Sequence, residues 1–276
     1  MMPLEFAGRV IYKMTGSGND FVFVDGRDGA GNWSPEAIRA VCARRVGVGA
    51  DGLVELVPGS GPGRVAFHFF NADGSRGAMC GNAALCATRL AVFLELAPAE
   101  GMILETDAGP VQTRCLSDGP HRAELLLPSL STMPAPVIPL EPGELSIGFA
   151  AVGVEHTVVR VADLEQVPMA VRGPYLRSHP GLGAPGANAN FVSKLPEGTW
   201  AMRTWERGVE GETLACGTGA VACGMVLAAA GEVTFPWSVR TRSGIALTVS
   251  GSREAPRLAG EGRLVYRASL VSLSGD

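Results

Sequence analysis

The sequence lacks several features that define large classes of protein. It has no run of about 20 apolar residues, the length that a membrane-spanning helix requires. It also has no run of basic residues, and 23 Lys and Arg against 27 Asp and Glu give a formal charge of -4. A nucleic-acid or anionic-membrane binder carries a basic patch. We therefore expect a small-molecule partner, and neither a nucleic acid nor a membrane.

Cysteine, histidine and lysine are also scarce. Six cysteines are too few for a disulfide scaffold in a chain of this length, and no Cys-x-x-Cys occurs. The four histidines show no metal-ligand spacing, and the N-terminal sequence lacks the basic and apolar regions of a secretory signal. We therefore expect a cytoplasmic protein with reduced thiols and no metal. Lys13 and Lys194 are the only lysines, so a Schiff-base cofactor has few candidate partners.

Apolar residues are abundant, at 46% of the 276 residues, which is enough for two well-filled domains. In the first half, Ser34 and Pro35 predict the start of a helix, as N-cap and first helical residue. The Ala- and Leu-rich segment from Cys80 to Leu96 carries few charges and predicts a helix buried on nearly all sides. Strand patterns occupy residues 9–14, 20–25 and 65–70, with a Gly-rich turn over 15–18 and further strands over 102–127.

The second half repeats this order. Strand signals over 150–161, a Gly- and Pro-rich loop over 173–186 and strands over 190–193 and 200–206 precede an apolar helix from Cys216 to about Ala230. Asp20-Phe21-Val22 recurs as Asn190-Phe191-Val192, and residues 70–80 correspond to residues 205–216. This repetition predicts a duplicated α/β unit.

We therefore predict an α/β (α+β) fold with two similar, pseudo-symmetric domains, each a curled mixed or antiparallel sheet around a central helix. The Ser-, Pro- and Gly-rich segment that begins at Ser131 is typical of a linker. A final strand near Gly262 to Leu273 is expected to return to the first domain. The predicted domains are residues 1–131 plus 262–276 and residues 132–261, with the active site in the cleft between them.

Each half places a cysteine before a glycine at the start of its apolar helix, in AMCGNAAL around Cys80 and in LACGTGAV around Cys216. The unsatisfied N–H groups and the positive dipole end of a helix start favour a thiolate, so we expect a lowered pKa for both thiols. The same N–H groups can hold a carboxylate, and Gly81 and Gly217 leave the backbone accessible to it.

Inversion of a stereocentre needs an acid and a base on opposite faces of the carbon, which two such thiols could supply. The alternative is that Cys80 and Cys216 are ordinary small buried residues. Their matching contexts favour the catalytic interpretation. Cys86 and Cys223 lie about two turns into the helices, so we expect them in the core.

Five segments then carry a resemblance to a known family. They are Gly18 to Phe21, Gly49 to Gly52, Asn71 to Ser75 leading to Met79 to Asn82, Asn188 to Phe191, and Glu206 to Gly208 leading to Ala215 to Gly219. With these motifs in this order, the chain resembles the diaminopimelate epimerase family of cofactor-independent amino-acid epimerases. The resemblance covers nearly the whole chain.

The resemblance implies that Cys80 and Cys216 exchange the roles of acid and base. His156 and Glu206 would modulate the thiol pKa, Arg207 would form a fork on a carboxylate, and Glu206 would also bind an ammonium group. The implied substrate-binding residues are Asn19, Asn71, Gly81, Asn82, Asn188, Glu206, Arg207, Gly217 and Thr218. The implied reaction interconverts LL- and meso-2,6-diaminoheptanedioate for lysine and peptidoglycan synthesis, without a cofactor and in a homodimer.

Some positions depart from the family pattern. Val154 and Glu155 stand where many members have Asn-Pro, Gly52 stands where some have glutamine, and residues 83–85 read Ala-Ala-Leu where many have Gly-Ala-Arg. A related racemase or epimerase of another amino acid therefore stays open, although Asn82 argues against the proline-type branch, which tends to have histidine there.

Blander alternatives also stay open. The chain could be a thiol-redox or amino-acid-binding protein in which the two cysteines form a reversible disulfide. Asn19 could be a turn residue, Glu206 and Arg207 a solvated pair, and His156 a structural histidine.

Overall fold

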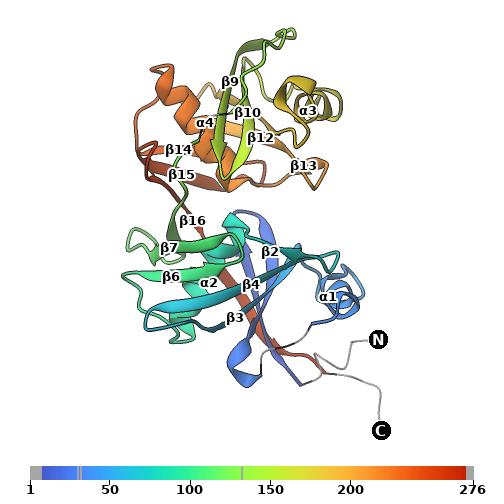
Figure 1. Cartoon of the computed structure of the whole chain (residues 1–276), viewed down its shortest axis with the longest axis vertical. Helices are drawn as coiled ribbons and strands as arrows, with labels where there is room; N and C mark the ends of the chain where they lie inside the picture. Colours follow the sequence, from blue (N-terminus) through green and yellow to red (C-terminus); the bar gives the residue numbers. More distant parts are fainter. Residues whose placement is uncertain (1–7, 30, 32, 132, 272–276) are drawn as a thin grey trace. The chain divides into compact units, whose positions relative to one another are not determined.

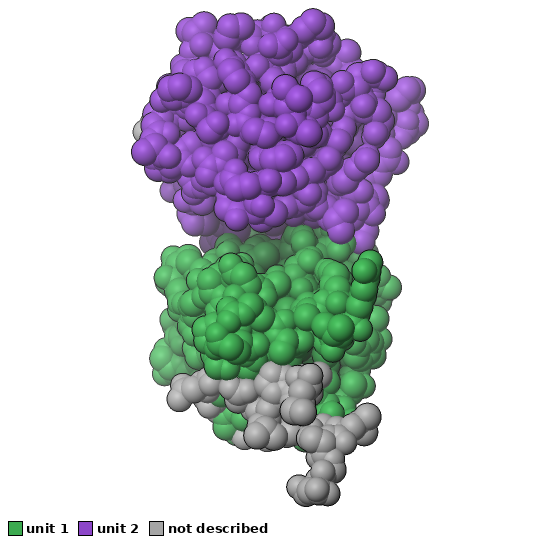
Figure 2. Space-filling model, turned by 90° about the vertical axis from the view of Figure 1, so that its right-hand side faces the viewer, with its two compact units in different colours: residues 1–125, 260–276 green, residues 126–259 purple. Residues whose placement is uncertain are grey.

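The computed structural model describes residues 8–29, 31, 33–131 and 133–271 of the chain. The chain divides into two compact units, which Figure 2 shows in different colours. Unit 1 comprises Met1–Leu125 and Gly260–Asp276, and unit 2 comprises Leu126–Ala259. In the described part of the chain, no helix has the length and apolar character needed to cross a membrane.

Unit 1 is built from strands with two α-helices among them (Figure 1). In chain order its elements are β1 (Val10–Gly16), β2 (Asn19–Asp25), the 3-10 helix η2 (Gly26–Asp28), α1 (Pro35–Cys42), β3 (Gly52–Pro58), β4 (Arg64–Asn71), β5 (Arg76–Gly77), α2 (Gly81–Phe93), β6 (Met102–Thr106), β7 (Gly109–Cys115), β8 (Arg122–Leu126) and, from the end of the chain, β17 (Arg263–Ser269).

Unit 2 has the same kinds of element, and its strands and α-helices follow a similar order. They are β9 (Glu144–Val152), β10 (Val154–Val161), α3 (Met169–Arg177), the 3-10 helix η3 (Pro180–Leu182), β11 (Asn188–Lys194), β12 (Trp200–Glu206), β13 (Gly211–Thr213), α4 (Gly217–Ala229), β14 (Trp237–Arg240), β15 (Ala246–Gly251) and β16 (Pro256–Glu261).

Strand pairing shows that unit 2 repeats unit 1. In unit 1, β1 and β2 are antiparallel, β2 and β3 parallel, β3 and β4 antiparallel, β4 and β6 parallel, and β6 and β7 antiparallel. In unit 2, the strands from β9 to β15 pair in the same sequence of directions. Each unit is therefore a mixed sheet with the same topology, and the predicted fold class is confirmed.

The topology corrects one part of the predicted repeat. The prediction aligned Asp20-Phe21-Val22 with Asn190-Phe191-Val192, but the first triplet lies in β2 and the second in β11. Because β11 pairs parallel with β10 as β3 pairs with β2, β11 corresponds to β3. Two Asx-Phe-Val strands look alike since both are buried, and only the pairing separates them. The second predicted match, β4 to α2 with β12 to α4, agrees with the topology.

The helix α2 is buried on nearly all sides, as predicted from its composition, and α4 is the equivalent apolar helix of unit 2. α2 contacts strands β1, β2, β3, β4, β6, β7 and β17, and lies among the strands of unit 1 in Figure 1. α4 contacts β9, β10, β11 and β15 in unit 2. Cys86 and Cys223 are fully buried in these helices, which confirms their predicted core position. Small residues make this packing possible: a Cβ on Gly16 of β1 would lie 2.7 Å from the Asn82 carbonyl of α2.

The helices α1 and α3 pack on the outside of their sheets. Ser34 caps α1 as predicted, since its hydroxyl accepts the Ala37 N–H at 3.1 Å. The prediction of a loop over residues 173–186 was wrong at its start, because α3 continues to Arg177 through Gly173 and Pro174. The reason is tertiary: a Cβ on Gly173 would lie 2.8 Å from the Trp205 ring, so glycine lets the helix lie against β12.

Other predicted boundaries shift by a few residues. The turn between β1 and β2 is centred on Ser17 and Gly18, with positive φ of 54° and 100°, as a two-residue hairpin turn requires. Asn19 therefore begins β2 and is not at the centre of the turn. The final strand ends at Ser269, and Ser272 and Leu273 of the prediction lie outside the described residues, as does Thr132 of the linker.

Candidate active site

Cys80 is the residue immediately before helix α2. Its backbone is extended, with φ of -134° and ψ of 122°, while its carbonyl accepts the Ala84 N–H at 2.9 Å in the first helical bond. The thiol is half-buried and does not cap the helix. It therefore lies at the positive end of the helix dipole, next to the backbone N–H groups of Gly81 and Asn82.

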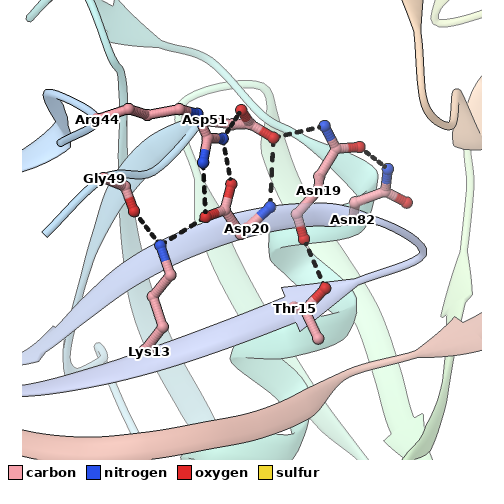
Figure 3. Close-up of polar contacts among 8 residues, drawn as sticks. All are labelled: Lys13, Thr15, Asn19, Asp20, Arg44, Gly49, Asp51 and Asn82. Carbon is pink, nitrogen blue, oxygen red and sulfur yellow. Dashed lines mark hydrogen bonds and ion pairs between the residues drawn. The ribbon is translucent and has the colours of Figure 1, made fainter. Parts of the chain in front are cut away.

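Asn82 and Asn19 meet at this helix start. The Asn82 amide donates to Asn19 Oδ1 at 2.7 Å, and Asn19 Nδ2 donates to Asp51 Oδ2 at 2.9 Å (Figure 3). A carboxylate oxygen only accepts, so Asp51 fixes which end of the Asn19 amide faces it. The remaining end then faces Asn82. Asp51 thus orients Asn19 and, through it, Asn82.

Asp51 is itself held by a cluster of charges. Its Oδ1 accepts from Arg44 at 2.8 Å, and the same Arg44 nitrogen donates to Asp20 Oδ1 at 2.6 Å (Figure 3). Lys13 pairs with the other Asp20 oxygen at 2.6 Å and also donates to the Gly49 carbonyl. Burial would raise the pKa of Asp20, but the contacts with Arg44 and Lys13 lower it. Asp20 is therefore a carboxylate around neutral pH, held by both cations.

Asn71 lies at the end of β4, and a Cβ added to Gly77 would lie 3.5 Å from its Nδ2. Its side chain is exposed and donates to Ser75 Oγ at 3.0 Å, within the turn that leads to β5. Its backbone lies opposite Gly52 in the β3–β4 pairing. The structure therefore brings together Asn19, Gly81 and Asn82 at the Cys80 helix start, and gives Asn71 a local partner in its own turn.

Cys216 occupies the equivalent position in unit 2. It precedes α4 with φ of -127° and ψ of 111°, and its carbonyl accepts the Ala220 N–H at 3.0 Å. Its Sγ lies 3.7 Å from Thr218 Oγ1. Unlike Cys80, it is almost fully buried, with 4% of its surface exposed.

The predicted lowering of the Cys216 pKa is wrong. Burial raises the pKa of this thiol well above its ordinary value, and the charge of Glu206 raises it further. Hydrogen bonds from the Gly219 backbone and Thr218 act in the opposite direction but do not outweigh burial. The argument from the helix dipole failed because the cost of desolvating a thiolate is larger than the stabilisation that one helix start provides. Cys216 is therefore a neutral thiol in this structure.

Glu206 lies at the end of β12, near enough to Cys216 for its charge to act on the thiol. Burial raises the pKa of Glu206, and the Thr213 hydroxyl opposes that shift. Its neighbour Arg207 bonds other groups, so the two residues do not form the solvated pair that the sequence left open. Glu206 is instead a largely buried carboxyl group, and its charge raises the pKa of the Cys216 thiol.

Arg207 and Asn188 are brought together in unit 2. Asn188 Oδ1 accepts the backbone N–H of Arg207 at 2.7 Å, which anchors the start of the loop after β12. The Arg207 side chain donates to Glu155 Oε2 at 2.9 Å and to the Gly186 carbonyl at 3.3 Å. The guanidinium that the resemblance assigns to a carboxylate fork therefore already holds a carboxylate of the chain.

His156 is completely buried in β10 and lies directly opposite Asn188 in the β10–β11 pairing. Burial lowers the pKa of His156 to about 3, and the nearby charge of Arg207 lowers it as well. Its Nδ1 lies 3.1 Å from the Asn190 amide nitrogen. The ring is therefore neutral over the whole physiological pH range.

Two positioning groups were missed from the sequence, Asp51 and Asn190, although both lie inside the motifs that carried the resemblance. Neither has a signal of its own, because an Asp in a Gly-Ala-Asp-Gly turn and an Asn in a strand have many structural uses. Among residues 8–29, 31, 33–131 and 133–271, no three or more His, Cys, Asp or Glu side chains gather into a possible metal site.

Comparison with known proteins agrees with this geometry. The family model described as diaminopimelate epimerase matches residues 11–126 and 148–261. A diaminopimelate epimerase of Gemmatimonas aurantiaca is 42% identical, over 95% of this chain and 99% of its own length. One of Aquifex aeolicus is 40% identical, over 88% of this chain and 90% of its own.

A solved structure shares the fold at low sequence identity. The phenazine biosynthesis protein of the PhzF family from Bacillus anthracis superposes with a TM-score of 0.73 at 14% identity, covering 96% of this chain and 99% of its own. The family model and the relatives together define an isomerase of the epimerase class. The chain belongs to the diaminopimelate epimerase family.

Proposed function

We propose that the protein interconverts LL- and meso-2,6-diaminoheptanedioate through two thiols, Cys80 and Cys216, without pyridoxal phosphate. One observation carries the proposal: the two cysteines precede corresponding helices, α2 and α4, in two units of the same strand order. A duplicated half-site of this kind is suited to a reaction that needs two similar groups on opposite faces of one carbon.

The proposed reaction is a transfer of two protons. One cysteine, as thiolate, takes the α-hydrogen of the amino acid, and the electron pair of the broken C–H bond passes into the carboxylate to give an enediolate. The other cysteine, as thiol, then protonates the carbon from the opposite face. Because Cys216 is buried and neutral, we assign Cys80 as the base in the direction that starts from this resting state. The roles exchange in the reverse direction.

The helix starts supply the stabilisation that this reaction requires. The backbone N–H groups that follow Cys80 and Cys216 would hold the reacting carboxylate and the charge that develops on it. Gly81, Asn82, Gly217 and Thr218 provide these groups. The two thiols must then face one α-carbon, which is a requirement of the proposal.

The remaining residues would recognise the rest of the substrate. We assign Arg207 to a carboxylate and Glu206 to an ammonium group, since these charges complement a diamino diacid. We assign Asn19, Asn71 and Asn188 to hydrogen bonds with the amino and carboxyl groups. His156 and Glu206 would tune the thiols through a neutral ring and a raised carboxyl pKa.

Exchange of the α-hydrogen with solvent tests this function. In deuterated water, the proposal predicts deuterium at the α-carbon of each product as LL- and meso-diaminoheptanedioate interconvert, with no added pyridoxal phosphate. A panel that includes proline, lysine and glutamate serves as the control for another amino-acid racemase. Exchange with one of those and none with the diamino diacid would contradict the proposed substrate and leave a related racemase.

Two features of the protein's setting belong to the same proposal. We propose that it acts in the cytoplasm, where its thiols stay reduced, and as a homodimer. Sedimentation equilibrium at micromolar concentration tests the second point, since a dimer has twice the 28.6 kDa mass of the chain.

A further inference from the structure

Asn190 lies at the centre of a buried polar cluster in unit 2. It is in β11, has no exposed surface, and contacts groups on both neighbouring strands. Its Nδ2 lies 3.0 Å from the Thr157 carbonyl and 3.1 Å from His156 Nδ1, both in β10. Its Oδ1 accepts the Thr204 hydroxyl of β12 at 3.0 Å.

These partners fix the orientation of the Asn190 amide. The Thr157 carbonyl can only accept, so the amide nitrogen must face it, and Thr204 can then donate to the amide oxygen. The second hydrogen of the same nitrogen has two neighbouring acceptors, His156 Nδ1 at 3.1 Å and the more distant Asn188 carbonyl at 3.4 Å, and we assign it to the nearer one. An amide nitrogen does not accept hydrogen bonds, so Nδ1 must be the acceptor in this contact. In a neutral ring the proton is then on Nε2.

The other side of the His156 ring has no such partner. Within the part of the chain that the structure describes, His156 Nε2 is buried and makes no hydrogen bond. A buried donor without an acceptor is costly, and in an enzyme it marks a place where a bound group can complete the interaction. The Asn190 contact therefore decides whether His156 Nε2 can donate a hydrogen bond to a ligand or accept one from it.

Asn190 also lies against the helix start that carries Cys216. A Cβ added to Gly219 would lie 2.3 Å from Asn190 Oδ1 and 3.2 Å from Cys216 Sγ. The same amide thus contacts the histidine ring through its nitrogen and the first turn of α4 through its oxygen.

We propose that Asn190 is a positioning residue that holds the neutral imidazole of His156 with its proton on Nε2, so that the ring acts as a hydrogen-bond donor and not as an acid or a base. This inference rests on the proposed function for its catalytic meaning. The tautomer itself can be measured without any substrate.

Nitrogen NMR of the full chain labelled with 15N-histidine tests the tautomer at pH 7. For His156 we expect Nδ1 to resonate as an unprotonated nitrogen and Nε2 as a protonated one. His156→Gln assigns the signals by removing them. His68 is a matched reference with the opposite geometry, since its Nδ1 faces the Glu55 carboxylate at 3.1 Å. A neutral His68 should therefore carry its proton on Nδ1.

Asn190→Asp replaces the amide donor by an acceptor of the same shape. We expect the His156 proton to appear on Nδ1 in this variant, while the His68 signals stay unchanged. A wild-type His156 with its proton on Nδ1 would overturn the proposal. The proposal would also be overturned if the His156 nitrogen signals of Asn190→Asp matched those of the wild type. The wild-type spectrum alone decides the tautomer if the variant does not fold.

The catalytic part has its own readout. We expect Asn190→Asp to lower kcat about tenfold with KM changed by less than about twofold, because Asn190 acts on His156 and not on substrate. Loss of the wild-type tautomer without a change in kcat would refute the positioning role. Absence of epimerisation in the wild type would instead refute the proposed function and leave the tautomer result standing.

Discussion

Arg207 and Glu155 form an ion pair in unit 2, with Arg207 Nη1 donating to Glu155 Oε2 at 2.9 Å. Both side chains are partly exposed, so the pair itself contributes little to stability. Its importance is chemical. Glu155 stands where many members of the family have proline, and it occupies the guanidinium that the proposal assigns to a substrate carboxylate.

Glu155→Gln should therefore release Arg207 for substrate. An exposed ion pair is worth at most about 1 kcal/mol, so we expect KM for diaminoheptanedioate to fall by about twofold to fivefold, with kcat unchanged. Steady-state kinetics on both stereoisomers measures this. Arg207→Ala is the matched control and should raise KM and lower kcat. A KM of Glu155→Gln at or above the wild-type value would show that Glu155 assists Arg207 and does not compete for it.

The two helix-start cysteines should be individually indispensable. Cys80→Ala and Cys216→Ala each remove one of the two proton-transfer groups, so we expect epimerisation to fall below detection in both. Cys86→Ala and Cys223→Ala remove buried thiols of the same helices and should keep most of the activity at a cost of about 1 kcal/mol in stability. Turnover near the wild-type rate in either of the first two variants would disprove the two-thiol scheme.

Asp51→Asn should disturb binding through Asn19. An amide cannot serve Arg44 and Asn19 as the carboxylate does, so Asn19 and Asn82 lose their fixed orientation. We expect KM to rise about tenfold and the free energy of unfolding to fall by about 1–2 kcal/mol.

The control for this variant is Asp107→Asn, which breaks an exposed pair with Arg76. It should change stability by less than about 0.5 kcal/mol and leave KM unchanged. Equal effects of the two substitutions would show that the Asp51 cluster is no more than a surface network.

His156 should make the protein sensitive to acid. Burial lowers its pKa to about 3 in the folded state, while an unfolded histidine titrates near pH 6.5. Between these values the unfolded state binds more protons, so stability falls as pH decreases through this window. From pH 7 to pH 5 the expected contribution is about 2 kcal/mol.

Urea unfolding of wild type and His156→Gln at both pH values measures this contribution. The variant should lose about 2 kcal/mol less than the wild type on acidification. His121→Gln, which removes an exposed histidine, is the control. If wild type and His156→Gln lost the same free energy of unfolding between pH 7 and pH 5, the His156 ring would be protonated in the folded state at pH 5.

Gly219→Ala should be harmful despite the high helix propensity of alanine. The added Cβ would lie 2.3 Å from Asn190 Oδ1 and 3.2 Å from Cys216 Sγ, so the amide or the helix start must move. We expect the free energy of unfolding to fall by about 1–3 kcal/mol and kcat to fall by about tenfold or more. Gly101→Ala has nothing within 4 Å of its new Cβ and should be neutral in both assays. A fully active Gly219→Ala would show that this contact does not constrain the site.

Much of the fold could be predicted because its signals are local. The Ser34 N-cap, the turn at Ser17 and Gly18, and the small, uncharged residues of α2 and α4 act over a few positions of the chain. α3 could not be predicted in this way. Gly173 and Pro174 disfavour a helix, and the helix forms since Gly173 allows close packing on Trp205.

In the candidate site, too, some features could be predicted from local motifs and others depend on tertiary contacts. The motifs identified Cys80, Cys216 and the residues after them, and the structure places these at equivalent helix starts. The pKa of Cys216 could not be predicted, because it depends on burial and on the charge of Glu206, which lies in a different strand. The partners of Arg207 and His156 also come from other strands.

The sequence by itself determined the two Cys-Gly helix starts, the duplication and the family, because these depend on residue type, spacing and order. Only the tertiary structure decided that Cys216 is a neutral thiol, that Arg207 is held by Glu155, and that Asn190 donates to His156. Burial and hydrogen-bond partners are set by strands that are distant in the chain and adjacent in the sheet.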